Sequence, residues 1–331
     1  MDVRKIIRHA VIMCAFIIAV SVPSHLLAQK IRVGYWTSGF SLGFGAVLEQ
    51  MKLAEKEGLN VDWIKFAEVN GPTRAIVSNS IDLAFAAPST NSMAIAADGV
   101  PVKIVLATQI AEAQIVVPDG SPIKAMSDLR GKKIGMSPPG SATHAIASAI
   151  LDQNFGIKPK EYSVAPGNEA RLAQFLTQKE IDAAVIRSVT IAQMGDTKLR
   201  RLASVVDEWK KLTKSSAAPI LAVTIVYNDY LSKNQEAVAK FIVAIRKTVD
   251  YGSKSKQRVA EILQKAANMN TDDALAYANQ WDGAYMASFE PQDVTSLKRM
   301  HEIVKAEGGA KKDPPQSAFE PGPYMRSKQI K

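Results

Sequence analysis

The chain carries one short pattern twice. Residues 80–94 read SIDLAFAAPSTNSMA, and residues 180–194 read EIDAAVIRSVTIAQM. Each copy has a short strand led by an acidic residue, which opens into a turn with hydroxyl side chains and then into a helix. Strands that alternate with helices form mostly parallel sheets. We therefore expect an α/β fold of two similar lobes, each a mostly parallel sheet flanked by helices.

The rest of the chain after residue 29 continues this alternation. It predicts strands at 30–36, 60–66, 81–86, 102–107, 114–117, 132–136, 162–165, 181–186, 202–206 and 219–226. It predicts helices at 42–57, 71–79, 90–97, 143–155 and 168–178. After residue 226 the pattern is helical, with apolar residues spaced three and four apart. The basic, Pro-rich tail from Lys311 onward is expected to pack late or fray.

The sequence Pro-Asp-Gly-Ser-Pro at 118–122 interrupts this pattern, which then starts again. Two segments that cross between the lobes, near Val117 and near Ala218, would form a hinge. Such a hinge lets an interlobe cleft close on a ligand. We assign residues 29–117 and 219–331 to lobe one and residues 118–218 to lobe two.

The first residues have the pattern of a secretory signal peptide, which we assign to residues 1–28. Arg4, Lys5 and Arg8 precede an apolar run at 10–20, and the small residue Ala28 follows. The run is too short to span the ~30 Å hydrocarbon core of a membrane as a stable helix. We expect cleavage near Ala28 and no stable membrane insertion afterwards. An uncleaved anchor is the alternative.

Cleavage would remove the only cysteine, Cys14, and leave two histidines, His144 and His301. Disulfides, thiolate chemistry, a zinc site and a cofactor are therefore not expected. The net charge of +9 would fall to +7, because the removed segment carries three cations and one carboxylate. The basic residues form no stripe with interleaved aromatics, so nucleic-acid binding is not expected. A surface that loosely favours anions is the simpler interpretation.

Five segments resemble one family in the same order along the chain. They are IRVGYWTSGF at 31–40, AAPSTNSMAIAADGVPVKIV at 86–105, SDLRGKKIGMSPPGSATHAI at 127–146, IDAAVIRSV at 181–189 and IVYNDYLSKNQEAVAKFIVAIRKTVDYG at 225–252. With these segments the chain resembles the periplasmic solute-binding proteins of ABC transporters, in the nitrate, sulfonate and taurine class. The resemblance covers nearly all of the chain after the signal peptide.

The resemblance implies a type II periplasmic-binding-protein fold with the ligand cleft between the lobes. It implies a periplasmic monomer that captures a small anion of the sulfonate, carboxylate or nitrate type and delivers it to a permease dimer with ATPase subunits. The chain departs from the family at one place. A Trp, an acidic residue and a Pro commonly follow the Asp-Ala-rich strand, whereas Arg187, Ser188 and Val189 stand here. The ligand of better-known members is therefore not carried over.

Ligands of doubly wound sheets bind beyond the carboxyl ends of the strands. In lobe one, these ends carry aromatic side chains, hydroxyls and helix starts, and exposed N–H groups at helix starts attract anions. The alternatives are that Trp36 lies in the core within a plain turn and that Asn70 only caps a helix. The ligand contacts predicted in lobe one are Trp36, Thr37, Ser38, Phe40, Asn70, Gly71, Thr73, Ser89 and Thr90.

In lobe two, the loop before the helix at 143–155 resembles the family's anion loop. We predict ligand contacts from Gly140, Ser141 and Thr143, since Gly140 permits close backbone approach and Ser141 offers a hydroxyl. Simple capping by Ser141 is the alternative. His144 is expected to be a structural histidine.

Arg187 is the predicted charge partner of the ligand. An arginine after a buried strand has a head group that needs a partner, and its planar fork fits a carboxylate or sulfonate. Ser188 and Glu169 complete the predicted site. An ion pair between Arg187 and Glu169, or another acid across the cleft, is the alternative.

Two other functional classes stay open from the sequence. The fold is shared with a thiamine-pyrimidine synthase, so a similar enzyme or a binder of pyrimidine precursors is possible. That enzyme family depends on a cysteine-rich segment and an active-site histidine, and after residue 28 this chain has no cysteine. No nucleophile–base pair is evident either. A sensory ligand-binding domain is the third class, although no signalling module follows it.

Overall fold

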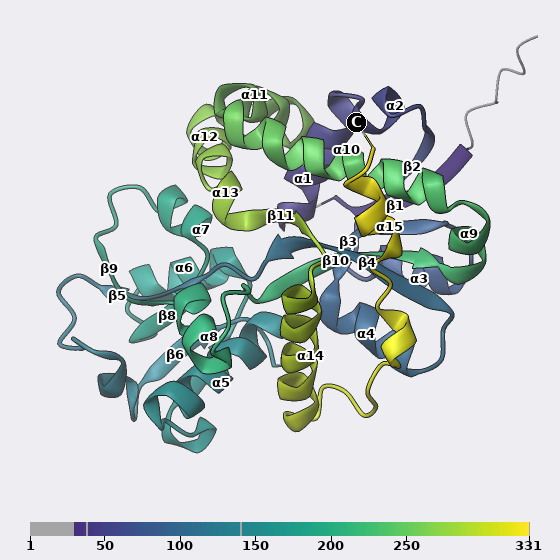
Figure 1. The fold of residues 1–331 in the computed structure, drawn as a ribbon. Helices are drawn as coiled ribbons and strands as arrows, with labels where there is room; N and C mark the ends of the chain where they lie inside the picture. The colour runs from purple at the N-terminus through teal and green to yellow at the C-terminus, as the bar shows by residue number, and fades with distance from the viewer. Residues whose placement is uncertain (1–29, 38, 140, 331) are drawn as a thin grey trace, which may run out of the picture.

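The computed structural model describes residues 30–37, 39–139 and 141–330. The predicted signal peptide and two predicted ligand contacts, Ser38 and Gly140, lie outside the described residues. The described chain forms a two-lobed α/β structure with one sheet in each lobe (Figure 1). The predicted fold class is thereby confirmed.

The first lobe is built on a mixed six-stranded sheet in the order β11-β4-β10-β3-β1-β2. Strands β1, β2 and β3 are parallel, and β10 runs antiparallel between β3 and β4. The strands are β1 (Lys30–Trp36), β2 (Asn60–Phe66), β3 (Leu83–Pro88), β4 (Val102–Ile110), β10 (Ile220–Tyr227) and β11 (Tyr285–Ser288).

Helices cover both faces of this sheet (Figure 1). On one face lie α1 (Gly39–Gln50), α2 (Leu53–Lys56) and α10 (Gln235–Lys254), and on the other lie α3 (Gly71–Val77), α4 (Ser89–Ala97) and α14 (Pro291–Ala306). The remaining helices of this lobe are α9 (Asn228–Lys233), α11 (Lys256–Ala267), α12 (Thr271–Asn279), α13 (Trp281–Ala284) and α15 (Gly322–Ser327).

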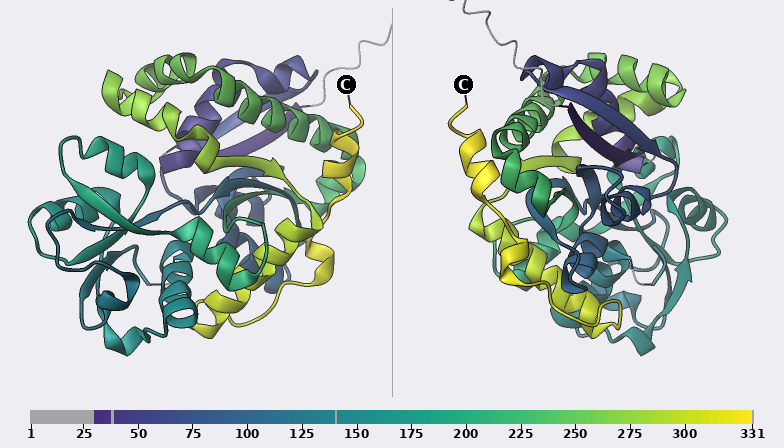
Figure 2. Two further views of the ribbon diagram at one scale, coloured as in Figure 1. Left: turned by 60° about the vertical axis from the view of Figure 1, so that its left-hand side comes forward. Right: turned by 90° about the vertical axis from the view of Figure 1, so that its right-hand side faces the viewer.

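The second lobe repeats this topology. Its five-stranded sheet has the order β7-β6-β8-β5-β9, and β5 runs antiparallel between β8 and β9. Its strands are β5 (Gln114–Pro118), β6 (Lys133–Met136), β7 (Ser163–Pro166), β8 (Ala183–Ile186) and β9 (Leu199–Ser204). Its helices are α5 (Ala142–Phe155), α6 (Glu169–Thr177), α7 (Ser188–Gln193) and α8 (Val205–Thr213). Figure 2 shows this lobe beside the larger one.

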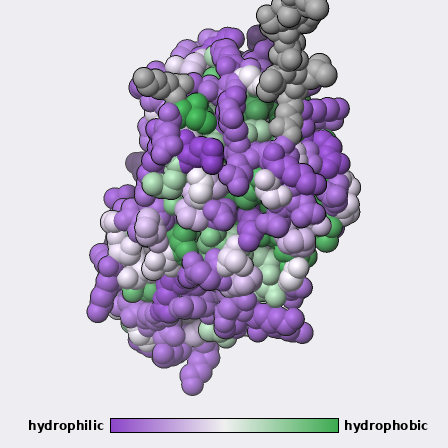
Figure 3. Space-filling model, turned by 45° about the vertical axis from the view of Figure 1, so that its right-hand side comes forward, coloured by the Kyte–Doolittle hydropathy of each residue, from purple (hydrophilic) through white to green (hydrophobic). Residues whose placement is uncertain are grey.

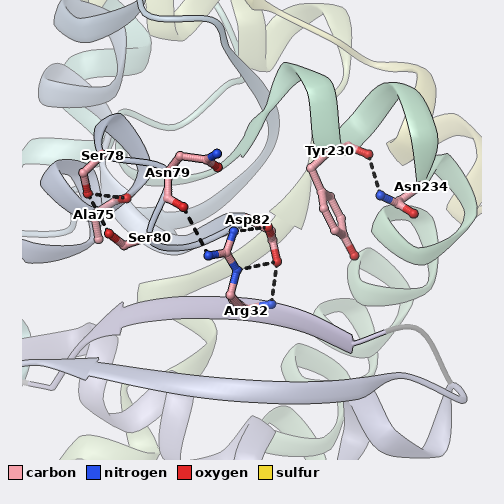
Figure 4. A network of polar contacts seen from close by, with 8 residues as sticks. All are labelled: Arg32, Ala75, Ser78, Asn79, Ser80, Asp82, Tyr230 and Asn234. Carbon is pink, nitrogen blue, oxygen red and sulfur yellow. Dashed lines mark hydrogen bonds and ion pairs between the residues drawn. The ribbon is translucent and has the colours of Figure 1, made fainter. Parts of the chain in front are cut away.

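The repeated sequence pattern occupies equivalent places in the two sheets. Asp82, before β3, accepts a hydrogen bond from the backbone N–H of Arg32 at 2.8 Å (Figure 4). Asp182, before β8, accepts one from the backbone N–H of Lys133 at the same distance. In both lobes an acidic side chain therefore fixes the register between the first strand and the third. The similarity of the lobes predicted from the sequence is seen in these contacts.

The chain changes sheets twice, and the two crossings lie side by side. The backbone N–H of Ala111, between β4 and β5, donates to the carbonyl of Pro219 at 2.8 Å. The first change of sheet falls between Ile110 and Gln114, a few residues before the predicted boundary at 117/118. We propose that the pair of crossings is the hinge. The lobe boundaries themselves stay predictions.

Four predictions about local structure were wrong. The helix expected at 42–57 is interrupted, because Lys52 has a left-handed backbone (φ 50°) and separates α1 from α2. The strand expected at 202–206 ends at Ser204, because the Ser204 side chain accepts from Asp207 N–H and so starts α8. The region after residue 226 is not wholly helical, because β11 pairs with β4 at the edge of the sheet. The tail does not fray: Phe319 and Tyr324 are buried, and α15 packs along α10 (Figure 2).

The face of the molecule in Figure 3 is mostly hydrophilic, with separate apolar patches. Among the described residues, the large apolar side chains that are well exposed are Val69, Val77 and Met325. In the same part of the chain, none of the helices combines the length and the apolar character needed to cross a bilayer.

Candidate functional site

Arg187 of the second lobe lies against the first helix of the first lobe. It is the residue between β8 and α7. Its guanidinium carbon lies 4.5 Å from the ring centroid of Phe40, the second residue of α1. The Arg187 side chain is only 20% exposed. A cation therefore lies where the two lobes meet, mostly out of water.

This guanidinium has no close acceptor among the described residues. The nearest carboxylate oxygen, Oε1 of Glu169, lies 3.7 Å from Nε, which is too far for a good hydrogen bond. Nε is buried and lacks a hydrogen-bond partner in the described chain. The ion pair considered from the sequence thus exists, but within one lobe and at long range. A mostly buried guanidinium without acceptors favours the entry of an oxyanion.

Two carboxylates hold the start of α7. Oε2 of Glu169 accepts from the backbone N–H of Arg187 at 3.0 Å and from the Thr190 hydroxyl at 2.7 Å. Glu112, in the crossing between β4 and β5, accepts from the backbone N–H of Ser188 at 3.1 Å and from its hydroxyl. The polar groups of Ser188 are therefore engaged within the protein. The group of this segment left for a ligand is the guanidinium of Arg187.

Two buried tyrosines hold the start of α1. The Tyr277 hydroxyl lies 3.0 Å from the carbonyl oxygen of Gly39, and the Tyr285 hydroxyl lies 2.7 Å from that of Phe40. The two hydroxyls are 2.6 Å apart. Burial raises the pKa of both phenols well above the usual value. Both therefore stay protonated at neutral pH and fix the Phe40 ring that Arg187 covers.

The predicted contacts near the ends of β1 and β2 form a rim on the first lobe. The indole N–H of Trp36 donates to the carbonyl of Ala67 at 3.1 Å, and the Thr37 hydroxyl donates to that of Phe66 at 3.1 Å. Both side chains are partly exposed. Trp36 is therefore not a core residue, but its N–H and the Thr37 hydroxyl already have backbone partners.

The predicted contacts on α3 and α4 are brought together by the bond from Asn91 Nδ2 to Asn70 Oδ1, at 2.8 Å. Thr73 is 2% exposed, and its hydroxyl has no partner among the described residues. Gly71 has a packing role, because a Cβ there would lie 2.6 Å from Cβ of Phe66.

Ser89 and Thr90 open α4, and their surroundings differ. The buried Ser89 hydroxyl donates to the carbonyl of Ile220 at 2.7 Å and so ties α4 to the returning strand β10. Thr90 is half-buried. Ser89 is thus used by the fold, whereas Thr90 is open to a ligand role.

Ser141 caps α5, which agrees with the alternative interpretation given for this residue in the sequence analysis. Its side chain accepts from the backbone N–H of His144 at 3.3 Å and donates to the carbonyl of Pro138 at 2.8 Å. The His144 ring contacts the carbonyl of Ser137 at 3.1 Å, which is a structural role. Thr143 is half-buried and lies 3.5 Å from the Ser141 hydroxyl. These contacts stay within the loop and the first turn of α5, so a ligand role for Ser141 and Thr143 stays a prediction.

Sequence reasoning missed Glu112, Tyr277 and Tyr285. Glu112 is 8% exposed although it is charged, and it lies in the crossing between the sheets. The sequence contained one signal for Glu112, because it is the one acidic residue between two apolar runs predicted as strands. A charge that is buried there needs partners. The two tyrosines gave no such signal. Within the described residues, no group of three or more His, Cys, Asp or Glu side chains is placed to hold a metal ion.

Comparison with known proteins gives the family. The family model described as "NMT1/THI5 like" matches residues 55–257. The chain belongs to this family. A relative from Brucella abortus (strain 2308), named as a putative binding protein, is 28% identical over 261 residues, which are 76% of this chain and 77% of the relative.

Solved structures share the fold at low sequence identity. The periplasmic aliphatic sulphonate-binding protein SsuA of Escherichia coli matches with a TM-score of 0.75 and 17% identity, over 88% of this chain and 92% of that one. The alkanesulfonate-binding protein SsuA of Xanthomonas axonopodis pv. citri, bound to MOPS, matches with a TM-score of 0.67 and 16% identity, over 88% and 98%. These matches establish the two-lobed periplasmic-binding-protein fold.

Proposed function

We propose that this chain is the substrate-binding component of an ABC importer and captures a small organic or inorganic anion between its lobes. The observation that carries the proposal is Arg187, a cation that is four-fifths buried at the meeting of the lobes and has no hydrogen-bond partner for Nε among the described residues. A sulfonate, carboxylate or nitrate would supply the missing acceptors. The names of the relatives support a binding role.

In this proposal the captured anion is delivered to a membrane permease, and the protein acts as a monomer in the periplasm. The signal-peptide pattern before Ala28 and the periplasmic proteins of the same fold support that location. Closure of the lobes brings Arg187 and Phe40 together around the anion, and opening releases it.

An enzyme on this fold is the second candidate, and the contacts of Ser141 weigh against it. A nucleophilic serine needs a base within hydrogen-bond reach. The Ser141 hydroxyl instead bonds the Pro138 carbonyl and the backbone of His144, and the His144 ring contacts the Ser137 carbonyl.

The test is thermal unfolding of residues 29–331 against a panel of small sulfonates, carboxylates, nitrate and neutral pyrimidines. A ligand at 100 times its Kd adds about 2.7 kcal/mol to the free energy of unfolding. We expect a rise in Tm of several degrees with at least one anion. A rise with a pyrimidine alone would contradict the anion assignment and favour the pyrimidine-precursor binder.

A further inference from the structure

A cavity lies beside α7, and Arg187 does not line it. Its volume is about 420 Å³, which is within the range of about 300–1,000 Å³ for small-molecule sites. Its floor is apolar and consists of Val116 of β5, Ile191 and Ala192 of α7 and Leu199 of β9. Val116, Ile191 and Leu199 belong to the hydrophobic cluster of the second lobe. The body of an occupant would therefore be apolar.

The charge of the cavity comes from one side chain, Arg201. Strand pairing places Arg201 opposite Val116, so both lie at the same position along the sheet. No ion pair or hydrogen bond engages the Arg201 side chain within the described residues, and no carboxylate lines the cavity. A planar guanidinium beside an apolar floor matches the carboxylate of a small organic acid.

Ser188 and two amides complete the wall. The side chain of Gln114 is oriented by its Nε2, which donates to Glu112 at 2.8 Å and to the Ser188 hydroxyl at 3.2 Å. Its Oε1 has no partner among the described residues. Gln280, between α12 and α13, comes from the first lobe, whereas the other lining residues come from the second. An occupant would thus touch both lobes where α7 packs on α12.

We propose that this cavity is a second ligand site, which takes a small organic acid with an apolar body and bridges the two lobes. Arg201 binds the carboxylate, and the floor of Val116, Ile191 and Leu199 covers the hydrocarbon part. The site has its own cation, and it shares Ser188, the residue after Arg187, with the predicted first site. Since its occupant contacts both lobes, it favours the arrangement in which α7 meets α12, and the two ligands assist each other's binding.

The experiment uses isothermal titration of residues 29–331 with hexanoate, acetate and hexylammonium. Hexanoate is expected to bind, and each buried methylene group strengthens binding about fourfold. Acetate is therefore expected to bind much more weakly, and hexylammonium, which has the wrong charge, is expected not to bind. Arg201 is exposed, and exposed charge pairs contribute up to about 1 kcal/mol, so in Arg201→Gln the Kd for hexanoate should rise about two- to fivefold. In Ile191→Glu binding should be abolished.

Two further variants test which arginine is responsible for hexanoate binding. Arg171→Gln removes an exposed arginine of the same lobe that does not line the cavity, and Arg187→Gln removes the cation of the first site. Arg171→Gln should bind hexanoate as the unaltered protein does. Arg187→Gln, which also removes the contact with Phe40 between the lobes, should weaken hexanoate binding less than Arg201→Gln does. The proposal is overturned if hexanoate does not bind, or if Arg187→Gln abolishes its binding while Arg201→Gln leaves it intact. That second outcome would place the acid at the first site and leave the proposed function standing.

Discussion

The guanidinium of Arg187 covers the ring of Phe40 at 4.5 Å, and the two residues belong to different lobes. The contact joins the start of α7 to the start of α1, and each start is held by polar side chains behind it. Opening the lobes would separate the pair. If the lobes move about the proposed hinge, the distance between Arg187 and Phe40 depends on how far they are open.

Phe40→Leu should weaken capture of the anion. The change keeps an apolar side chain but removes the aromatic face, and cation–π contacts that are partly desolvated contribute ~1–2 kcal/mol. We expect the Kd of the captured anion to rise about five- to thirtyfold in titration calorimetry. Phe175→Leu is the control, because Arg171 covers Phe175 at 4.9 Å within the second lobe. If Phe40→Leu and Phe175→Leu raised the Kd equally, a role of Phe40 in anion capture would be contradicted.

Glu112→Gln should destabilise the protein and disturb α7. The carboxylate accepts from Ser188 N–H, from the Ser188 hydroxyl and from Gln114, and an amide oxygen accepts these bonds less strongly. Hydrogen bonds to a charged group contribute about 1.5–3 kcal/mol each, so we expect a loss of about 2 kcal/mol in urea unfolding. Glu236→Gln, at an exposed helical pair with Lys240, should cost less than about 0.5 kcal/mol. If Glu112→Gln lost no more stability than Glu236→Gln, the role of Glu112 in holding the start of α7 would be refuted.

The two lobes should respond differently to loss of the equivalent acids. Asp82 binds the Arg32 side chain through both oxygens as well as its backbone N–H (Figure 4), whereas Asp182 accepts from the backbone of Lys133. Asp82→Asn should cost about 2–3 kcal/mol and Asp182→Asn about 1 kcal/mol. Equilibrium unfolding of the two variants checks this order. A larger loss of stability in Asp182→Asn than in Asp82→Asn would contradict this prediction.

Tyr230→Phe should be neutral or stabilising. The Tyr230 hydroxyl is buried and has no partner among the described residues (Figure 4), so the change removes an unsatisfied group. Tyr35→Phe is the matched contrast, because the Tyr35 hydroxyl donates to Glu49 at 2.9 Å, and its loss should cost about 1–2 kcal/mol. Urea unfolding at pH 7 compares the two. A clear loss of stability in Tyr230→Phe would mean that its hydroxyl is satisfied in solution.

Tyr230 should also make the stability of the protein depend on pH in the alkaline range. Burial raises the pKa of Tyr230 to about 12, above the value near 10 of an unfolded chain. The unfolded state therefore loses this proton first, and the associated stability is complete below pH ~10 and is lost as the pH rises towards 12. In urea unfolding between pH 9 and 11, Tyr230→Phe should lose less stability than the unaltered protein. If the two proteins lost stability equally between pH 9 and 11, the raised pKa of Tyr230 would be contradicted.

Much of the fold could be predicted from the sequence, because local patterns determine it. The strands at 30–36 and 60–66 were predicted with their observed ends, and the repeated Ile-Asp pattern indicated two similar lobes. The start of α8 was missed, because the cap formed by Ser204 and Asp207 overrode an apolar run. β11 was missed because a strand of four residues gives little pattern before it pairs with β4.

The site was less predictable, because its supports come from distant parts of the chain. Arg187 was named as a candidate from its place after a buried strand, and Phe40 from the end of β1, and the structure brings the two side chains together. Glu112 reaches Ser188 across 76 positions, and Tyr277 reaches Gly39 across 238. Such contacts depend on how the two sheets are joined. No local spacing in the sequence encodes them.

Arg187 is proposed to hold an anion between the lobes. The most direct measurement is the Kd, by titration calorimetry, of the most stabilising anion of the panel for residues 29–331 and for the variants Arg187→Gln and Arg171→Gln. We predict that Arg187→Gln raises the Kd at least about tenfold, because it removes a charged hydrogen-bond donor, while Arg171→Gln leaves it unchanged. An unchanged Kd in Arg187→Gln, with the fold intact by circular dichroism, would contradict the account.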